Sequence, residues 1–461
     1  MAHTRREFLC NCVATFGATA LAMNKFGLIN ALAQTADYRV LVCIFLFGGN
    51  DSDNVIIPYD DYSEYAAVRS NPTLLQIPQS SLLQITANGS GGGRTYGLHP
   101  SLTALQSLWQ GGKVAAVCNV GPLSQPLTRS DYLSHPDLRP RNLFSHSDQQ
   151  AQWQTSLADQ AIASGWGGRT ADKTRLLNPA DVRFPMMITV SGVTLFTTGQ
   201  SELPLALSPG AAFRLEGFPT PPDADPRYQA VRQLVGADRQ PVLVRSAAIT
   251  LEQAIENARD LTTLPTVGPF PNTPLGGQLR QVAQLINLNR QAPSLGLNRQ
   301  LFFCSLGGFD THNSQVTNGI PVTGTHANLW VQVSDAMKAF YDETVAQGVA
   351  SNVTTFTLSD FARTFRPNGT LGTDHAWGSH QFVMGGAVNG GSFFGTFPTL
   401  VPNGPDDSDS GSGARGRWIP TTSVDQYGAT LASWYGVSNA DLPAVFPNLS
   451  RFGTANLGFL S

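Results

Sequence analysis

Residues 301–312 read Leu301-Phe302-Phe303-Cys304-Ser305-Leu306-Gly307-Gly308-Phe309-Asp310-Thr311-His312. The apolar part of this stretch is typical of a β-strand, and the glycine pair predicts a sharp turn directly after it. A carboxylate and an imidazole, Asp310 and His312, then follow two residues apart. Parallel α/β sheets gather functional side chains at the carboxyl ends of their strands, so this stretch predicts both an α/β fold and a site.

The same pattern occurs twice more. The apolar run 40–47 leads into Gly48-Gly49-Asn50-Asp51, and the run 353–358 leads into Ser359-Asp360. A single Asp after a strand is commonly a turn former or a helix N-cap. Three of them, followed by Asp374-His375 and His380, favour a shared metal site over three separate turns. We therefore expect Asp51, Asp310, His312, Asp360 and one of His375 or His380 to converge.

The apolar runs predict a mainly parallel central sheet with helices on both faces. Almost every residue of 39–47 is apolar, as in a strand that is covered on both sides. The expected strands are 39–47, 114–120, 186–190, 193–197, 301–306 and 353–358, and the expected helices are 59–69, 100–110, 225–260, 276–289 and 325–347. We expect one α/β domain over residues 34–461, with residues 182–274 as an inserted cap.

The N-terminus resembles a twin-arginine export signal. Arg5 and Arg6 precede a mildly apolar stretch, 13–22, and Ala31-Leu32-Ala33 supplies small residues of the kind that a signal peptidase reads. The alternative is a cytosolic chain with a chance arginine pair. We expect residues 1–33 to be a signal peptide, the twin-arginine translocase to be a partner, and the mature chain to be periplasmic or secreted. No other apolar run approaches the roughly 20 residues that span a bilayer.

Charge and cysteine usage exclude several classes of protein. The chain of 461 residues has a formal net charge of −3, and removal of Arg5, Arg6, Lys25 and Glu7 with the signal gives −5. This weak acidity gives no support for nucleic-acid binding. Two of the 5 cysteines lie in the signal, and Cys43, Cys118 and Cys304 lie in apolar runs. Their spacing argues against a disulfide framework or a zinc cluster, and we expect three buried strand residues.

Residues 142–155 predict a helix start that carries hydroxyl groups. Ser147 or Asp148 would cap this helix, and a hydroxyl at a helix N-terminus also lies where negative charge is favoured. Ser145 and Ser147 are therefore candidate nucleophiles, with a purely capping role as the alternative. Arg169, which follows Gly165-Trp166-Gly167-Gly168, would contact either an anion or a carboxylate.

These motifs together resemble an exported bacterial family of unknown function, DUF1501, over nearly all of the mature chain. The quoted motifs are Phe47-Gly48-Gly49-Asn50-Asp51, Gly307-Gly308-Phe309-Asp310-Thr311-His312, Ser359-Asp360-Phe361-Ala362-Arg363-Thr364 and Gly372-Thr373-Asp374-His375. That family is in turn similar to the alkaline phosphatase and sulfatase superfamily. The resemblance implies that fold and a divalent metal, with Zn, Mn, Mg and Ca as the candidates.

The resemblance also implies roles for individual residues. Asp51 would match the metal-binding Asp after the first strand, Asp310 and His312 an Asp/His ligand pair, and Asp360 the Asp of a Ser-Asp-His pattern. His375 or His380 would match the last His, and Ser145 or Ser147 would stand near the nucleophile.

Two departures from the superfamily pattern are evident. The Asp and His of the pair are two residues apart rather than four, and Phe361 stands where a His is expected. An oxygen-rich ligand set with few imidazoles would favour Mg, Mn or Ca over paired zinc.

The implied activity is metal-dependent hydrolysis of a phosphate or sulfate ester, with a small anionic ester or a surface polymer as the partner. The alternative is a non-catalytic secreted scaffold that retains the fold. A sugar-binding or polymer-binding module is a third option and rests on scattered aromatic residues.

Overall fold

The computed structural model describes residues 38–180, 182, 184–210, 217–219, 223–236, 248, 251–252, 254–255, 257–258, 261, 263–291 and 295–461. The expected export signal, residues 1–33, lies outside the described residues. The expected cap, residues 182–274, lies partly outside them. Among the described residues, no helix combines the length and the apolar character that crossing a membrane requires.

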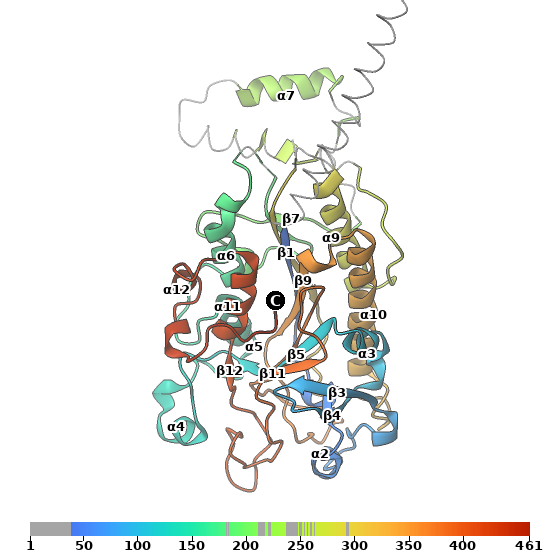
Figure 1. Ribbon diagram of the computed structural model, residues 1–461, viewed down its shortest axis with the longest axis vertical. Helices are drawn as coiled ribbons and strands as arrows, with labels where there is room; N and C mark the ends of the chain where they lie inside the picture. Colours follow the sequence, from blue (N-terminus) through green and yellow to red (C-terminus); the bar gives the residue numbers. More distant parts are fainter. Residues whose placement is uncertain are drawn as a thin grey trace, which may run out of the picture.

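The described strands form one mixed α/β sheet with a mostly parallel centre, as the apolar runs predict (Figure 1). Its 12 strands follow the order β2-β4-β3-β11-β5-β10-β9-β1-β8-β6-β7, and β12 pairs with β5. The neighbours β9, β1, β8, β6 and β7 run parallel, whereas β10 is antiparallel to β9 and β5. The strands are β1 (Arg39–Leu46), β2 (Ile56–Pro58), β3 (Leu83–Gly89), β4 (Arg94–Leu98), β5 (Val114–Gly121), β6 (Met187–Thr189), β7 (Leu205–Ala206), β8 (Arg299–Leu306), β9 (Val353–Ser359), β10 (Ser379–Gly385), β11 (Ser392–Gly395) and β12 (Thr422–Ser423).

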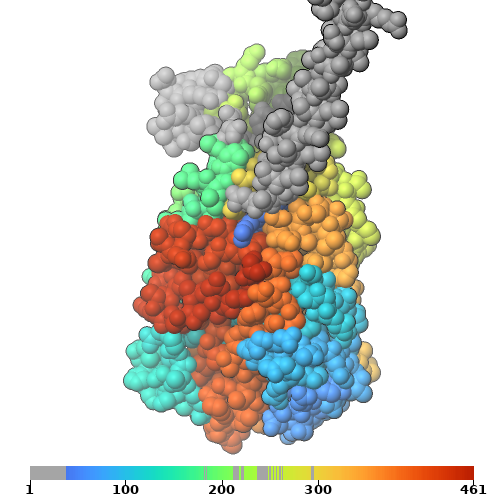
Figure 2. Space-filling view, viewed as in Figure 1, coloured from blue at the N-terminus to red at the C-terminus, as the bar shows by residue number. Residues whose placement is uncertain are grey.

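Helices cover both faces of the sheet, with α3, α9 and α10 on one side and α5, α6, α11 and α12 on the other (Figure 1). The α-helices of the described residues are α2 (Tyr62–Arg69), α3 (Thr103–Gln110), α4 (Arg129–Ser134), α5 (His146–Thr155), α6 (Trp166–Thr174), α7 (Pro226–Gly236), α9 (Pro274–Gln291), α10 (Thr325–Ala346), α11 (Val424–Tyr435) and α12 (Leu442–Val445). Figure 2 shows early segments of the chain, in blue, against late ones in orange, in line with the pairing of β11 with β3 and β5.

The three strands that end in Asp lie next to one another at the centre of the sheet. In their parallel register, Leu46 of β1 lies opposite both Leu306 of β8 and Ser359 of β9. The three strands therefore end level, and the chain segments that follow them begin at the same edge of the sheet. The core is continuous around these strands, and Cys43, Cys118 and Cys304 are buried free thiols within it, as expected.

One expectation about local structure is wrong, and a second, a helix, is present with a different first turn. Residues 193–197 were expected to form a strand, but Leu195–Thr197 is a short 3-10 helix, since Gly192 turns the chain and Phe196 packs edge-on against Trp166 with 4.7 Å between ring centroids. The helix expected over residues 100–110 opens instead with a 3-10 turn, Pro100–Leu102, because the side chain of His99 caps the N–H of Ser101.

Candidate metal centre

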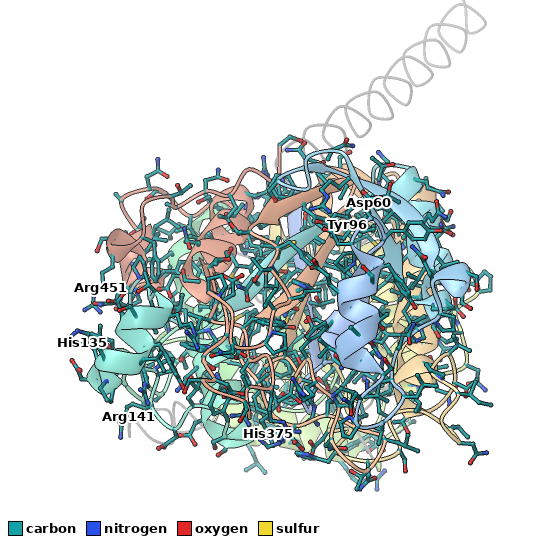
Figure 3. All side chains as sticks on the ribbon, turned by 90° about the horizontal axis from the view of Figure 1, so that it is seen from below. Asp60, Tyr96, His135, Arg141, His375 and Arg451 are labelled. Carbon is teal, nitrogen blue, oxygen red and sulfur yellow. The ribbon has the colours of Figure 1, made fainter. Side chains whose placement is uncertain are left out.

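Four side chains converge at the carboxyl edge of the sheet. His146, Asp310, His312 and His375 each offer one ligand atom, and these atoms lie within 4.8 Å of one another. His146 begins α5, Asp310 and His312 follow β8, and His375 lies in the segment between β9 and β10. Figure 3 shows His375 at one edge of the molecule, with Asp60 and Tyr96 toward the opposite edge.

The ligand atoms of this cluster lie close enough together to share one small ion. Nε2 of His312 lies 2.7 Å from Nε2 of His375. Oδ1 of Asp310 lies 3.2 Å from Nε2 of His312, 3.4 Å from Nε2 of His146 and 3.8 Å from Nε2 of His375. The side chain of Asp310 is 49% exposed and that of His312 is 41% exposed, so the cluster is open to solvent on one side.

The other nitrogen of each imidazole is bonded to an acceptor. Nδ1 of His146 lies 2.7 Å from Oδ2 of Asp360, Nδ1 of His312 lies 3.0 Å from Oδ1 of Asp374, and Nδ1 of His375 lies 2.7 Å from the carbonyl oxygen of Phe144. A carboxylate or a carbonyl accepts, so each Nδ1 donates and, in a neutral ring, each Nε2 carries a lone pair. The three lone pairs face Asp310 and one another, which is the arrangement that second-shell bonds produce around a metal.

Arg363 holds the carboxylate of the cluster in place. Its buried guanidinium donates to Asp310 and to the carbonyl oxygens of Gly49 and Phe309. Burial alone would raise the pKa of Asp310, but the hydrogen bond and the charge of Arg363 lower it. Asp310 is therefore ionised near neutral pH and available as a ligand.

The pKa values of His146 and His375 are shifted in opposite directions. Hydrogen bonding to Asp360 raises the pKa of His146, and burial opposes this effect. Burial lowers the pKa of His375, which favours its neutral form.

A strained turn directs His146 into the cluster. Asn142 and Phe144 have φ values of +48° and +73°, in the left-handed region that an L side chain seldom adopts. The ring of Phe144 packs under the guanidinium of Arg417 at 4.6 Å, and Arg417 also donates to the carbonyl oxygen of His375. These contacts stabilise the turn at Phe144, whose carbonyl group accepts from His375 and orients it.

Phe361, which stands where the family resemblance leads us to expect a histidine, packs beneath the cluster. Its ring centroid lies 4.7 Å from that of His146 and 4.7 Å from that of His375. The close approach depends on glycine, because a Cβ at Gly49 would collide with this ring. Phe361 therefore supplies an apolar floor that limits how far the two imidazoles move.

The structure brings some of the predicted ligands together. Asp310, His312 and His375 belong to the cluster, and Asp360 and Asp374 bond to its imidazoles from behind. Asp374 also pairs with Arg415.

Asp51 and His380 lie outside this group. Asp51 is buried and accepts from Arg69 and Gln315. His380 is buried, accepts from the backbone N–H of Asn119 and stacks on Phe397.

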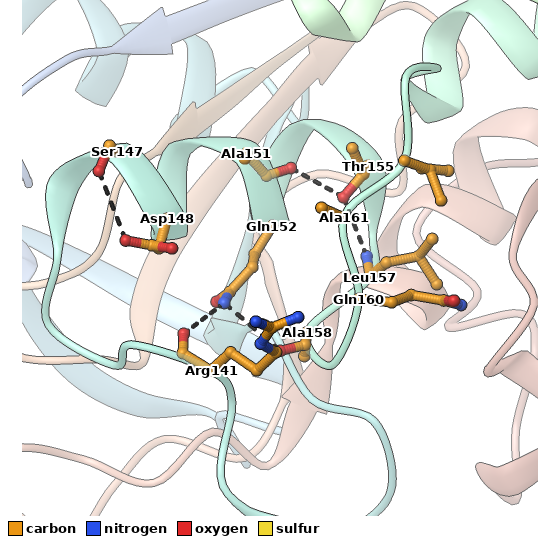
Figure 4. A pocket seen from close by; sticks show the side chains of 11 residues that line it. Arg141, Ser147, Asp148, Ala151, Gln152, Thr155, Leu157, Ala158, Gln160 and Ala161 are labelled. Atoms are coloured by element: carbon orange, nitrogen blue, oxygen red, sulfur yellow. Dashed lines mark hydrogen bonds between the residues drawn. The ribbon is translucent and has the colours of Figure 1, made fainter.

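The predicted catalytic residues have other contacts. Ser145 is the N-cap residue of α5, and its hydroxyl donates to Oδ2 of Asp148 at 2.6 Å. Ser147 and Asp148 line a cavity of about 210 Å³ beside α5, together with Gln152 and Arg141 (Figure 4). Arg169 is buried and donates to the carbonyl oxygens of Thr155, Ser164 and Val445.

Sequence reasoning did not select His146. It focused on the serines on either side of His146, because a hydroxyl at a helix start suggests a nucleophile. The chain has 8 histidines, and imidazole is a common metal ligand, so the residue type of His146 is the one signal that the sequence offers for it. The supporting roles of Arg363 and Gln315 depend on tertiary contacts and have no sequence signal.

One family model matches part of the chain. It is described as a protein of unknown function, DUF1501, and matches residues 293–407. The matched segment includes Asp310, His312, Asp360, Asp374 and His375, and His146 lies before it. A search of curated proteins finds no match.

Solved structures with similar chain paths were also found. The chain of Ps i-CgsB, in complex with k-i-k-neocarrahexaose, has 9% identity and a TM-score of 0.34 over 91% of this chain and 75% of that one. The lipoteichoic acid synthase LtaP from Listeria monocytogenes has 6% identity and a TM-score of 0.33, over 88% and 74%. The PsFucS1 sulfatase from Pseudoalteromonas sp. has 9% identity and a TM-score of 0.29, over 80% and 68%.

Proposed function

We propose that this chain is a metal-dependent hydrolase of phosphate or sulfate esters, with one divalent ion held by His146, Asp310, His312 and His375. The observation that carries the proposal is the convergence of three Nε2 atoms and one carboxylate, with each Nδ1 bonded to an acceptor. If both rings are neutral with the proton on Nδ1, the two imidazole lone pairs that face each other at 2.7 Å repel in the absence of an ion. A cation between them removes that conflict, so the residues fit a metal.

The donor set favours zinc among the candidate metals. Three imidazole nitrogens and one carboxylate oxygen are typical zinc ligands, whereas Mg²⁺ and Ca²⁺ prefer oxygen ligands. This set is richer in nitrogen than the oxygen-rich set expected from sequence, because His146 joins it. Mn²⁺ remains an alternative for a set of this kind.

The charges around the cluster favour an anionic substrate. Asp310 is the one carboxylate of the ligand set, and Arg363 offsets its charge. Asp374 is similarly paired with Arg415. A divalent ion would therefore keep much of its positive charge for an incoming phosphate or sulfate group. Such an ion supplies Lewis acidity and lowers the pKa of water.

The chain's own residues would orient the reacting groups. Asp360, Asp374 and the carbonyl group of Phe144 fix the three imidazole rings, and Arg363 fixes Asp310. The exposed side of Asp310 and His312 admits substrate. Ser145 and Ser147 are the proposed nucleophiles, and they flank His146 in the sequence. Ser145 occupies the N-cap position of α5, but its hydroxyl donates to Asp148 and makes no hydrogen bond to a backbone N–H of the helix.

The activity test uses folded protein that is stripped with a chelator and reloaded with Zn, Mn, Mg or Ca. Aryl phosphate monoesters, aryl phosphate diesters and aryl sulfates are the substrates. We expect turnover with wild-type protein and a loss of several orders of magnitude in His312→Ala. If a serine is the nucleophile, Ser145→Ala or Ser147→Ala loses activity while it keeps the metal. Exposed His135, replaced by Ala, is the control.

The second candidate function is a secreted scaffold with a structural metal. It is favoured by the four protein ligands, since closed sites with four ligands are commonly structural. Protein that binds metal and gains stability from it, yet turns over none of the ester classes, would support the scaffold and contradict the hydrolase.

We further propose export through the twin-arginine pathway, with a mature chain that begins near Gln34. The support is Arg5-Arg6 followed by Ala31-Leu32-Ala33. Replacing both arginines with Lys keeps the charge but removes the guanidinium pair that the receptor reads, so the precursor should stay in the cytoplasm. Unimpaired export of the Lys-Lys variant would contradict this proposal.

A further inference from the structure

The two turns that carry most of the cluster run side by side. The backbone N–H of Thr373 donates to the carbonyl oxygen of Thr311 at 3.0 Å. Gly372 packs so closely against the carbonyl groups of Thr311 and His312 that no Cβ fits there. Thr311 lies between Asp310 and His312, and Thr373 directly precedes Asp374-His375. The relative position of these two turns therefore sets the spacing of the ligand atoms.

A buried glutamine joins the two turns through its side chain. Oε1 of Gln315 accepts from Oγ1 of Thr311 at 3.1 Å and from Oγ1 of Thr373 at 2.8 Å. All three residues are at least 98% buried. A single amide oxygen thus receives one hydroxyl from each ligand-bearing turn.

Asp51 holds this amide in one orientation. Nε2 of Gln315 donates to Oδ2 of Asp51, and Arg69 donates to Oδ1 of the same carboxylate. An ionised carboxylate only accepts, so the NH₂ group of Gln315 must face Asp51 and its oxygen must face the threonines. Both oxygens of Asp51 are engaged, and Asp51 and Arg69 are fully buried.

We propose that Gln315 is a positioning residue that clamps the two ligand-bearing turns, and that Asp51 anchors the clamp and does not ligate a metal. The guanidinium of Arg69 supplies the positive charge beside Asp51, so the site holds one ion and not two. This inference rests on the proposed function, because it presupposes a metal at the cluster. It assigns a role to the strand-end carboxylate that sequence reasoning expected to be a ligand.

The test compares Gln315→Leu with Gln278→Leu. Gln278 is a matched control, because it is also a buried glutamine whose amide makes two bonds, to the N–H and the carbonyl oxygen of Ser305. Co²⁺ is the probe, since its visible absorption reports the geometry of its ligands. Titration gives its Kd and stoichiometry, and chemical denaturation gives the stability of each variant.

We expect wild-type protein to bind one equivalent of Co²⁺. Gln315→Leu should weaken binding on the order of tenfold and shift the absorption bands, as second-shell changes do. Gln278→Leu should lose stability but keep the wild-type Kd and spectrum. If Gln315→Leu does not fold, Thr373→Val removes one clamp bond with little change of shape and should show the same shift.

Three results would overturn the inference. If both Gln315→Leu and Thr373→Val have the wild-type Kd and spectrum, Gln315 does not position the two ligand-bearing turns. The proposed metal site would stand in that case. Two equivalents bound by wild-type protein, falling to one in Asp51→Asn, would make Asp51 a ligand. Wild-type protein that binds no Co²⁺ would overturn the proposed function, and this inference with it.

Discussion

Nδ1 of His146 lies 2.7 Å from Oδ2 of Asp360, although 214 residues separate them in the chain. Gln150, one turn further along α5, donates to the same carboxylate oxygen at 2.8 Å. The start of α5 is thereby fixed to the end of β9. This relationship turns Nε2 of His146 toward Asp310 and makes a helix residue part of a site that otherwise belongs to strand ends.

Removal of His146 should strongly weaken metal binding. In His146→Ala the cluster loses one of four ligand atoms, so we expect the Zn²⁺ affinity to fall by at least about a hundredfold, beyond the loss typical of a second-shell change. Competition with a chromogenic chelator measures this affinity. His135→Ala, at an exposed histidine on the C-terminal side of α4, should keep wild-type affinity. Equal affinities in the two variants would exclude His146 as a ligand.

Loss of Asp374, the carboxylate bonded to Nδ1 of His312, should lower the metal affinity less than loss of His146 does. Asp374→Ala removes the acceptor for Nδ1 of His312 while it leaves all four ligands, so we expect the metal affinity to drop by about 10-fold to 100-fold. Calorimetric titration with Zn²⁺ measures it. Asp441→Ala, which removes a partner of Lys173 and Ser438, is the control and should titrate like wild-type protein.

The buried charge of Arg69 should matter for stability. Arg69→Met leaves Asp51 without its buried ion partner, and breaking such a pair costs about 3–5 kcal/mol in the free energy of unfolding. Arg94→Met breaks a pair that is 48% exposed on both sides, which should cost no more than about 1 kcal/mol. Urea denaturation measures both values. Similar losses in the two variants would contradict the account of Arg69.

Asp425 should make stability depend on pH. Burial raises the pKa of this carboxyl to about 8, so the folded chain keeps a proton that the unfolded chain releases near pH 4. The unfolded state therefore binds fewer protons between about pH 4 and 8. The contribution of Asp425 to the free energy of unfolding therefore falls as pH rises, by up to about 1.4 kcal/mol per pH unit.

Asp425→Asn cannot release a proton, so its stability relative to wild-type protein should increase from pH 5 to pH 8. Denaturation curves at each pH measure this difference, and Asp137→Asn, at an exposed position, is the control. A constant difference across this range would show that Asp425 ionises alike in the folded and unfolded chain.

The fold was predictable where one residue type dominates a run. The apolar stretches 39–47 and 301–306 correspond to β1 and β8, because strands buried on both faces tolerate few polar residues. The stretch 353–358, which corresponds to β9, combines Val, Phe and Leu with the β-branched residue Thr, which also favours a strand. Residues 193–197 have equally apolar members, but tertiary packing of Phe196 on Trp166 decides their conformation. Short apolar runs do not contain that information.

The candidate site was predictable in part for the same reason. Asp310 and His312 follow directly from the end of a strand, and local sequence places them. His146 depends on the positive φ values of Asn142 and Phe144; Asn adopts such values more readily than most residues, but they are unusual for a bulky residue such as Phe. Asp51 meets the sequence criteria for a ligand, but its partners Arg69 and Gln315 are 18 and 264 residues away. Such contacts follow from the folded chain.

The most direct test of the central claim is an anomalous diffraction map from crystals of residues 34–461 grown with Zn²⁺. The account predicts one zinc peak at ligand distances of about 2.0–2.2 Å from Nε2 of His146, His312 and His375 and from a carboxylate oxygen of Asp310. Asp51 should stay bonded to Arg69 and Gln315. A map with no peak at this cluster, or with its main peak at Asp51, would contradict the account.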